Sequence, residues 1–144
     1  MEHHGSSPSR IEKDEKRPRD HASPSMIDLV VLKRFEEPDE VREMSKGRFE
    51  IVHIGGMTIG RATYEPGWKW SVDVGPSVGA ERCEVEHVGL VLQGTATAAF
   101  EGGRVIELRA GSLFYIPPIP HDSWVVGDQP YVSLHFLGAE KYAK

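Results

Sequence analysis

Residues 67–127 read GWKWSVDVGPSVGAERCEVEHVGLVLQGTATAAFEGGRVIELRAGSLFYIPPIPHDSWVVG. Short apolar runs alternate here with glycine and proline, and a cluster of cysteine, histidine and glutamate precedes the run that ends at Gly94. Many short strands separated by Gly and Pro, with little helical periodicity, are typical of an antiparallel β-sandwich or barrel. This stretch therefore predicts an all-β fold.

The same pattern extends on both sides of this stretch. It predicts strands over 26–35, 49–54, 57–64, 68–72, 83–92, 95–100, 104–108, 112–116, 123–126 and 131–137. Residues 36–44 carry an early proline and several acidic residues, which favour a short helical turn. A double-sheet jelly roll is one arrangement that protects the edges of so many strands.

Length and composition predict one folded domain behind an N-terminal arm. The chain has 144 residues, of which 39% are hydrophobic and 27% charged, as in an ordinary globular protein. Residues 1–25 contain almost no apolar side chain and carry balanced charge, so we expect a disordered tail there. The barrel domain is expected over 26–144.

Charge and hydropathy exclude several partners. The formal net charge of −5 and the pI near 5.8 argue against nucleic-acid binding. No apolar run reaches membrane-spanning length, so we expect no membrane insertion and a cytoplasmic location. The single cysteine, Cys83, forms no intrachain disulfide and is a thiol, a ligand or an intermolecular link.

The residues before Gly94 resemble the first motif of the cupin superfamily, which has the form G-x5-H-x-H-x3-4-E-x6-G. His87 stands at the position of the motif's glutamate, with six residues between it and Gly94. Cys83 stands at the second histidine and Glu81 at the first. All three ligand positions of this motif therefore carry a different residue type.

The Pro-rich corner resembles the second cupin motif, G-x5-P-x-G-x2-H-x3-N. Gly111 and Pro117 match it with the right gap, while Ile119 replaces the inner glycine and His121 arrives one residue early. The final asparagine is absent. The resemblance implies a small single-domain, cupin_2-like protein with an antiparallel double-sheet jelly-roll barrel, and a homodimer.

Strand alternation predicts which residues share the interior. Within the strand expected at 83–92 and the residues just before it, positions 81, 83, 85 and 87 face one side, while Arg82, Glu84 and Glu86 face the other. Together with the resemblance, this predicts metal ligands at His87, His121, Cys83 and Glu81. Thiolate and imidazole ligands favour a divalent transition metal (Zn, Fe, Ni or Mn) over Mg²⁺ or Ca²⁺.

Plainer interpretations of the same residues stay open. Cys83 is equally consistent with a small buried hydrophobe, because free cysteine is among the most buried residue types. His87 is consistent with an interior histidine bonded to a carbonyl, and His121 with a residue that caps the corner. A ligand pocket is predicted from four side chains, Trp70, Gln93, Tyr115 and Trp124, although ordinary β-packing explains the aromatic ones too.

Two classes of function follow. The first is a protein that binds a small molecule, and a divalent metal, inside the barrel. The second is a metal-dependent enzyme (oxygenase, isomerase or lyase) acting on a small organic acid, a sugar derivative or an aromatic compound. The sequence contains no G-x-S-x-G, P-loop, G-x-G-x-x-G or CxxC pattern that would favour another chemistry.

Overall fold

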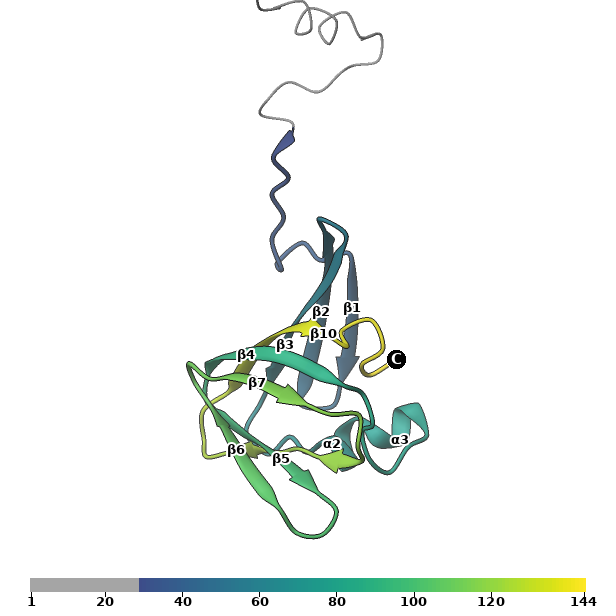
Figure 1. Cartoon of the computed structure of the whole chain (residues 1–144), viewed down its shortest axis with the longest axis vertical. Helices are drawn as coiled ribbons and strands as arrows, with labels where there is room; N and C mark the ends of the chain where they lie inside the picture. Colours follow the sequence, from purple (N-terminus) through teal and green to yellow (C-terminus); the bar gives the residue numbers. More distant parts are fainter. Residues whose placement is uncertain (1–28) are drawn as a thin grey trace, which may run out of the picture. The chain divides into compact units, whose positions relative to one another are not determined.

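Two antiparallel β-sheets build the protein, whose computed structural model describes residues 29–144 (Figure 1). The larger sheet has the order β1-β2-β3-β10-β4-β7, and the smaller has the order β6-β5-β8, with β9 also paired to β5. The strands are β1 Glu40–Met44, β2 Gly47–Ile54, β3 Met57–Tyr64, β4 His87–Gln93, β5 Thr95–Phe100, β6 Val105–Arg109, β7 Leu113–Ile116, β8 His121–Asp122, β9 Val125–Val126 and β10 Tyr131–Leu137. The predicted all-β double-sheet jelly roll is confirmed.

The predicted disordered tail at 1–25 lies outside the described residues, so the division into 1–25 and 26–144 stays a prediction. Within the described part, the strands expected at 57–64, 95–100 and 131–137 have the predicted bounds. The strands expected at 49–54, 104–108 and 112–116 are confirmed with small shifts of their ends. Of the strand expected at 123–126, only Val125–Val126 forms a strand, β9; Ser123 and Trp124 separate it from β8.

The N-terminal region of the described chain differs from the prediction. Residues 29–35 contain no strand, so that prediction is wrong for the part of 26–35 that the structure describes. The helical turn expected within 36–44 is also wrong, because residues 40–44 form β1. Strand β1 pairs with β2 over five positions, from Glu40 opposite Ile51 to Met44 opposite Gly47, and this ladder overrides local helix signals.

The strand expected at 68–72 is replaced by two short helices, α2 Trp70–Asp73 and α3 Gly75–Val78. The Asp73 carboxylate accepts a hydrogen bond from the Lys69 amide at 2.8 Å, and the Asp122 carboxylate accepts one from the Ser71 amide at 3.0 Å. These bonds satisfy amide donors at the start of α2 that have no partner within the helix. The strand prediction failed because it could not include a partner from β8.

The strand expected at 83–92 begins only at His87. Cys83 forms an isolated antiparallel bridge to His121, in which each backbone amide donates to the other residue's carbonyl, at 2.9 and 3.0 Å. Residues 84–86 between the bridge and β4 belong to no strand. The bridge between Cys83 and His121 therefore holds the first and second cupin-like motifs side by side.

The core fills the space between the two sheets. Its most deeply buried large side chains are Phe49, Ile51, Trp68, Val74 and Val91. The Tyr64 ring stacks on the Trp68 ring, with their centroids 3.7 Å apart. Within the described residues, no helix is long and apolar enough to cross a membrane.

Candidate metal centre

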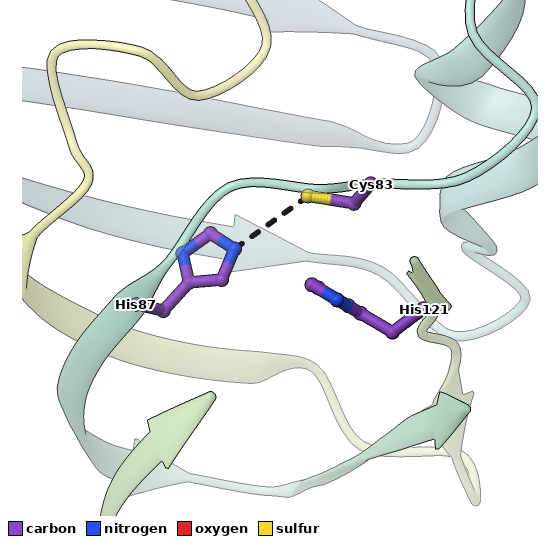
Figure 2. A group of neighbouring side chains, drawn as sticks. All are labelled: Cys83, His87 and His121. Carbon is purple, nitrogen blue, oxygen red and sulfur yellow. Dashed lines mark hydrogen bonds between the residues drawn. The ribbon is translucent and has the colours of Figure 1, made fainter. Parts of the chain in front are cut away.

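Cys83, His87 and His121 converge from three separate segments (Figure 2). His87 is the first residue of β4, His121 is the first residue of β8, and Cys83 lies on the extended segment between α3 and β4. The backbone bridge between Cys83 and His121 fixes two of the three positions. All three side chains are buried, with at most 4% of their surface exposed.

The spacing of the three donor atoms fits a metal ion. The candidate ligand atoms all lie within 4.8 Å of one another, and the Cys83 Sγ is 3.6 Å from the His87 Nε2. Two ligands of a tetrahedral zinc-type ion, with bond lengths of about 2.3 Å to sulfur and about 2.0 Å to nitrogen, are about 3.5 Å apart. The same distance also suits a hydrogen bond between a neutral thiol and imidazole, which is the contact drawn in Figure 2.

His121 is already oriented for binding through one nitrogen. Its Nδ1 lies 2.8 Å from the carbonyl oxygen of Ile119, so this nitrogen donates a proton and the Nε2 keeps its lone pair. Metal-bound histidines commonly donate their second nitrogen to a carbonyl in this way. The short Pro-rich turn places Ile119 two residues before its partner.

His87 lacks the corresponding support. Its Nδ1 is buried and has no hydrogen-bond partner among the described residues. An unpartnered buried polar atom costs about 1–3 kcal/mol, so this nitrogen marks a position that favours an added hydrogen-bond partner. Of the two histidines, His121 is thus the better prepared ligand.

Burial sets the protonation of all three residues. Burial lowers the pKa of His87 to about 2, with further lowering from His135 and His121, and burial also lowers the pKa of His121. Burial raises the pKa of the Cys83 thiol to about 11. At neutral pH the metal-free imidazoles are therefore neutral and able to bind, while the thiol must lose its proton when it becomes a ligand.

A small cavity adjoins the three residues. Its volume is about 40 Å³, enough for about two or three water molecules, and Ser133, His135, Tyr131 and Tyr142 contribute to its wall. The Ser133 Oγ lies 3.0 Å from the His135 Nε2, and the His87 and His135 rings have centroids 5.4 Å apart. An ion held by three protein ligands would have an open position for a further ligand.

His135 is the residue at this site that sequence reasoning missed. It is buried and lines the cavity. The available signal was the alternation of β10, where Tyr131, Ser133 and His135 share one face and three apolar residues share the other. Polar residues face inward here, the reverse of the usual pattern.

Glu81, the fourth predicted ligand, does not join the cluster. It is exposed, and it lines a surface groove with Ser71 and Arg82. The face shared by positions 81, 83, 85 and 87 does not form, because residues 84–86 are not in a strand. The structure thus brings together three of the four predicted ligand residues.

The predicted pocket residues lie in different places. Trp70 lines the central cavity. Gln93 is exposed and donates to the Pro130 carbonyl at 3.3 Å, while Trp124 is half-buried, with the Lys69 ammonium 5.3 Å from its ring centroid. Tyr115 is 58% exposed and is one of the residues around a separate groove.

Comparisons with known proteins agree with this architecture. The family model of the cupin domain (Cupin_2) matches residues 68–136, which include all three clustered residues. The chain therefore belongs to the cupin superfamily. No curated protein matches the sequence.

Several solved structures are similar to this chain at low sequence identity. Procruciferin, an 11S globulin from Brassica napus, is 16% identical, with a TM-score of 0.51 over 74% of this chain and 30% of that chain. A cupin 2 domain-containing protein from Halorhodospira halophila is 23% identical, with a TM-score of 0.49 over 66% of each chain. A cupin-like protein from Thermotoga maritima is 14% identical, with a TM-score of 0.46 over 68% of this chain and 71% of that chain.

Proposed function

We propose that this cupin domain binds a divalent transition metal through Cys83, His87 and His121 and holds a small molecule beside it. The observation that supports this proposal is the convergence of three buried donors within 4.8 Å of one another. One thiolate and two imidazoles favour Zn²⁺, Fe²⁺ or Ni²⁺, with Mn²⁺ less well matched to a sulfur ligand. Mg²⁺ and Ca²⁺ prefer oxygen ligands and do not fit this set.

Elemental analysis of the full chain tests the metal. We expect near-stoichiometric metal in the wild type and its loss in His87→Ala and in His121→Ala. His53→Ala is the matched control, because His53 is exposed on β2 and bonds only Thr58 through its ring. Thermal melts establish that each variant is folded. Wild-type protein that contains no metal and takes up none of Zn²⁺, Fe²⁺, Ni²⁺ or Mn²⁺ would overturn the proposal.

Cobalt substitution gives a second measurement that does not depend on how the histidine variants fold. Thiolate ligation of Co²⁺ produces a sulfur-to-metal charge-transfer absorption in the near ultraviolet. We expect this band in the Co²⁺-loaded wild type and its disappearance in Cys83→Ser. A wild type that binds Co²⁺ without this band would remove Cys83 from the ligand set.

A metal-dependent enzyme is the second candidate, and the observation that favours it is the three-residue ligand set beside a cavity. A bound metal would supply Lewis-acid chemistry at the remaining position. Oxygenase, isomerase or lyase activity on a small organic acid, a sugar derivative or an aromatic compound fits a site of this kind. Unchanged recovery of a bound ligand from the metal-loaded protein, with O₂ present, indicates a binding protein; conversion indicates an enzyme.

The proposal includes a homodimer in the cytoplasm. A reducing compartment would keep a thiol such as Cys83 available as a ligand. Strand β7 lies at the edge of the larger sheet and exposes Leu113 and Tyr115, with 75% and 58% of their surfaces accessible. Exposed apolar side chains on an edge strand favour association with another chain.

A further inference from the structure

A large apolar groove opens beside the metal centre, between the smaller sheet and the corner after β7. Its volume is about 460 Å³, and most of its wall is aliphatic or aromatic. The lining residues are Ala98, Phe100, Arg104, Ile106, Leu108, Tyr115, Ile116, Pro117 and Ile119. A groove of this size and composition matches the usual site for a small organic ligand.

The pairing of β5 with β6 explains why the groove is hollow and why its wall changes from apolar to charged along its length. On the face of this hairpin that lines the groove, Ile106 pairs with Ala98 and Leu108 pairs with Ala96, so small side chains alternate with larger ones. At the hairpin end of the same face, the Arg104 carbonyl oxygen accepts a hydrogen bond from the Phe100 amide. The face therefore changes from aliphatic to cationic along its length.

The groove and the metal cavity share two wall residues. Leu108 and Ile116 line both spaces, and Ile116 pairs with His87 across β7 and β4. Phe100, at the groove, lies with its ring centroid 5.9 Å from that of His121. A ligand in the groove would thus lie next to the side chains that separate it from the metal site.

Arg104 is the one charged residue among those that line the groove. Within the described part of the chain, its guanidinium takes part in none of the ion pairs, whereas Arg109 at the end of β6 is paired with Glu107 at 2.6 Å. An unpaired guanidinium at the rim of an apolar groove provides two to five donors for a carboxylate. The apolar wall and the cationic end of the groove together favour a ligand that has an apolar body and one negative charge.

We propose that the groove binds a small amphipathic carboxylate, with its apolar body against Ile106, Leu108 and Ile116 and its carboxylate on Arg104. This inference deepens the proposed function by naming a class of ligand. It rests on the proposed function in one respect, namely that the groove leads to a bound metal. Arg104 then acts as a specificity-determining residue that selects anionic ligands over neutral ones of the same shape.

The test compares 4-phenylbutyrate with 4-phenylbutan-1-ol, which has a similar apolar body and no charge. Full-length protein with ¹³C-labelled isoleucine methyl groups is titrated with each compound, first metal-free and then Zn²⁺-loaded. Ile106, Ile116 and Ile119 report on the groove, and Ile51, Ile54 and Ile59 on β2 and β3 are internal controls. We expect shifts confined to the first group and about three- to tenfold tighter binding of the carboxylate.

Two arginine variants separate a specific contact from general charge. Arg104→Gln should abolish the preference for the carboxylate, in metal-free protein as well. Arg109→Gln, which removes the same charge from the opposite face of β6, should retain it. Equal effects of the two variants would overturn the inference, as would an absence of shifts at the three groove isoleucines.

The outcomes also distinguish this inference from the proposed function. Metal uptake without carboxylate binding in the groove contradicts the inference and leaves the metal proposal standing. Binding of the carboxylate in the groove of a protein that takes up no metal supports the groove site and contradicts the metal proposal.

Discussion

At the scale of single residues, burial keeps two neighbouring histidines neutral, and this should make the metal-free protein sensitive to acid. Burial lowers the pKa of His135 to about 4 and that of His87 to about 2, while both would titrate near 6.5 in the unfolded chain. Above pH 6.5 neither state binds these protons, so the histidines add no pH dependence. Below it the unfolded chain binds them and the folded protein does not, so stability falls.

The expected slope is up to about 1.4 kcal/mol per pH unit for each histidine. Of these two, both contribute between pH 6.5 and 4 and only His87 contributes below that, while His121, whose pKa burial also lowers, adds to the slope. Urea denaturation of metal-free protein from pH 7 to 4.5 measures the slope, and His135→Gln should make it shallower by up to half. His53→Ala, at an exposed position, should leave it unchanged. A slope that His135→Gln does not alter would contradict the neutral buried state.

A buried pair of hydroxyl groups provides a second prediction at this scale. The Tyr64 hydroxyl donates to the Tyr142 hydroxyl at 2.7 Å, and both side chains are buried. Tyr142→Phe removes the acceptor and leaves the Tyr64 hydroxyl without it, which should cost about 1–3 kcal/mol of unfolding free energy. Chemical denaturation measures this loss. Tyr115→Phe is the control, because it removes a solvent-exposed hydroxyl that donates to Glu86 at 2.6 Å, and it should cost less than about 1 kcal/mol.

At the scale of elements, the sequence predicted what local patterns determine. Strands β3, β5 and β10 were predicted with their observed bounds because turn residues flank each of them. Helix α2 was missed because its amide donors are satisfied partly by Asp122, which is 51 residues from Ser71 in the chain. Local sequence carries no information about such a distant partner.

The candidate site likewise contains residues that local patterns predict and residues whose position depends on the rest of the fold. Cys83, His87 and His121 could be proposed from motif spacing, and the structure places them together. The prediction of Glu81 depends on one strand that continues through 81–87, and residues 84–86 do not form a strand. His135 could not be proposed from a pattern in which core residues are apolar, because the inward face of β10 is polar.

Close packing between β4 and β10 yields a prediction for one glycine. A Cβ atom at Gly89 would lie 2.3 Å from the Leu134 carbonyl oxygen and 2.5 Å from the Phe114 ring. Gly89→Ala must therefore displace a neighbouring strand, and we expect a loss of about 1–3 kcal/mol in urea denaturation.

Gly55→Asn is the matched control for Gly89→Ala. Gly55 has a φ of +59° with open space around it, a conformation that asparagine tolerates. The stability of the Gly55→Asn variant should therefore stay close to that of the wild type. Equal losses in the two variants would show that the close approach at Gly89 does not limit stability.

At the scale of the whole molecule, part of the larger sheet has its more apolar side facing outward. Strand β10 faces inward with Tyr131, Ser133 and His135, so Val132, Leu134 and Phe136 lie on its other face. Neighbouring strands continue this outer face with Leu90 on β4 and its partner Leu113 on β7. A contiguous apolar face of this kind is typical of a surface covered in an assembly.

The homodimer that we propose would cover this face, and one charge at its most exposed position should weaken it. Leu113 is 75% exposed, so Leu113→Asp should leave the fold intact while placing a carboxylate in the interface, where burial of an unpaired charge is costly. Light scattering coupled to size-exclusion chromatography should give twice 16.0 kDa for the wild type and a dissociation constant at least about tenfold weaker for the variant. Val105→Asp places the same charge at a 51% exposed valine on the smaller sheet and should leave the dimer unchanged. A monomeric wild type at high micromolar concentration would contradict the dimer, and equal weakening by both variants would place the interface elsewhere.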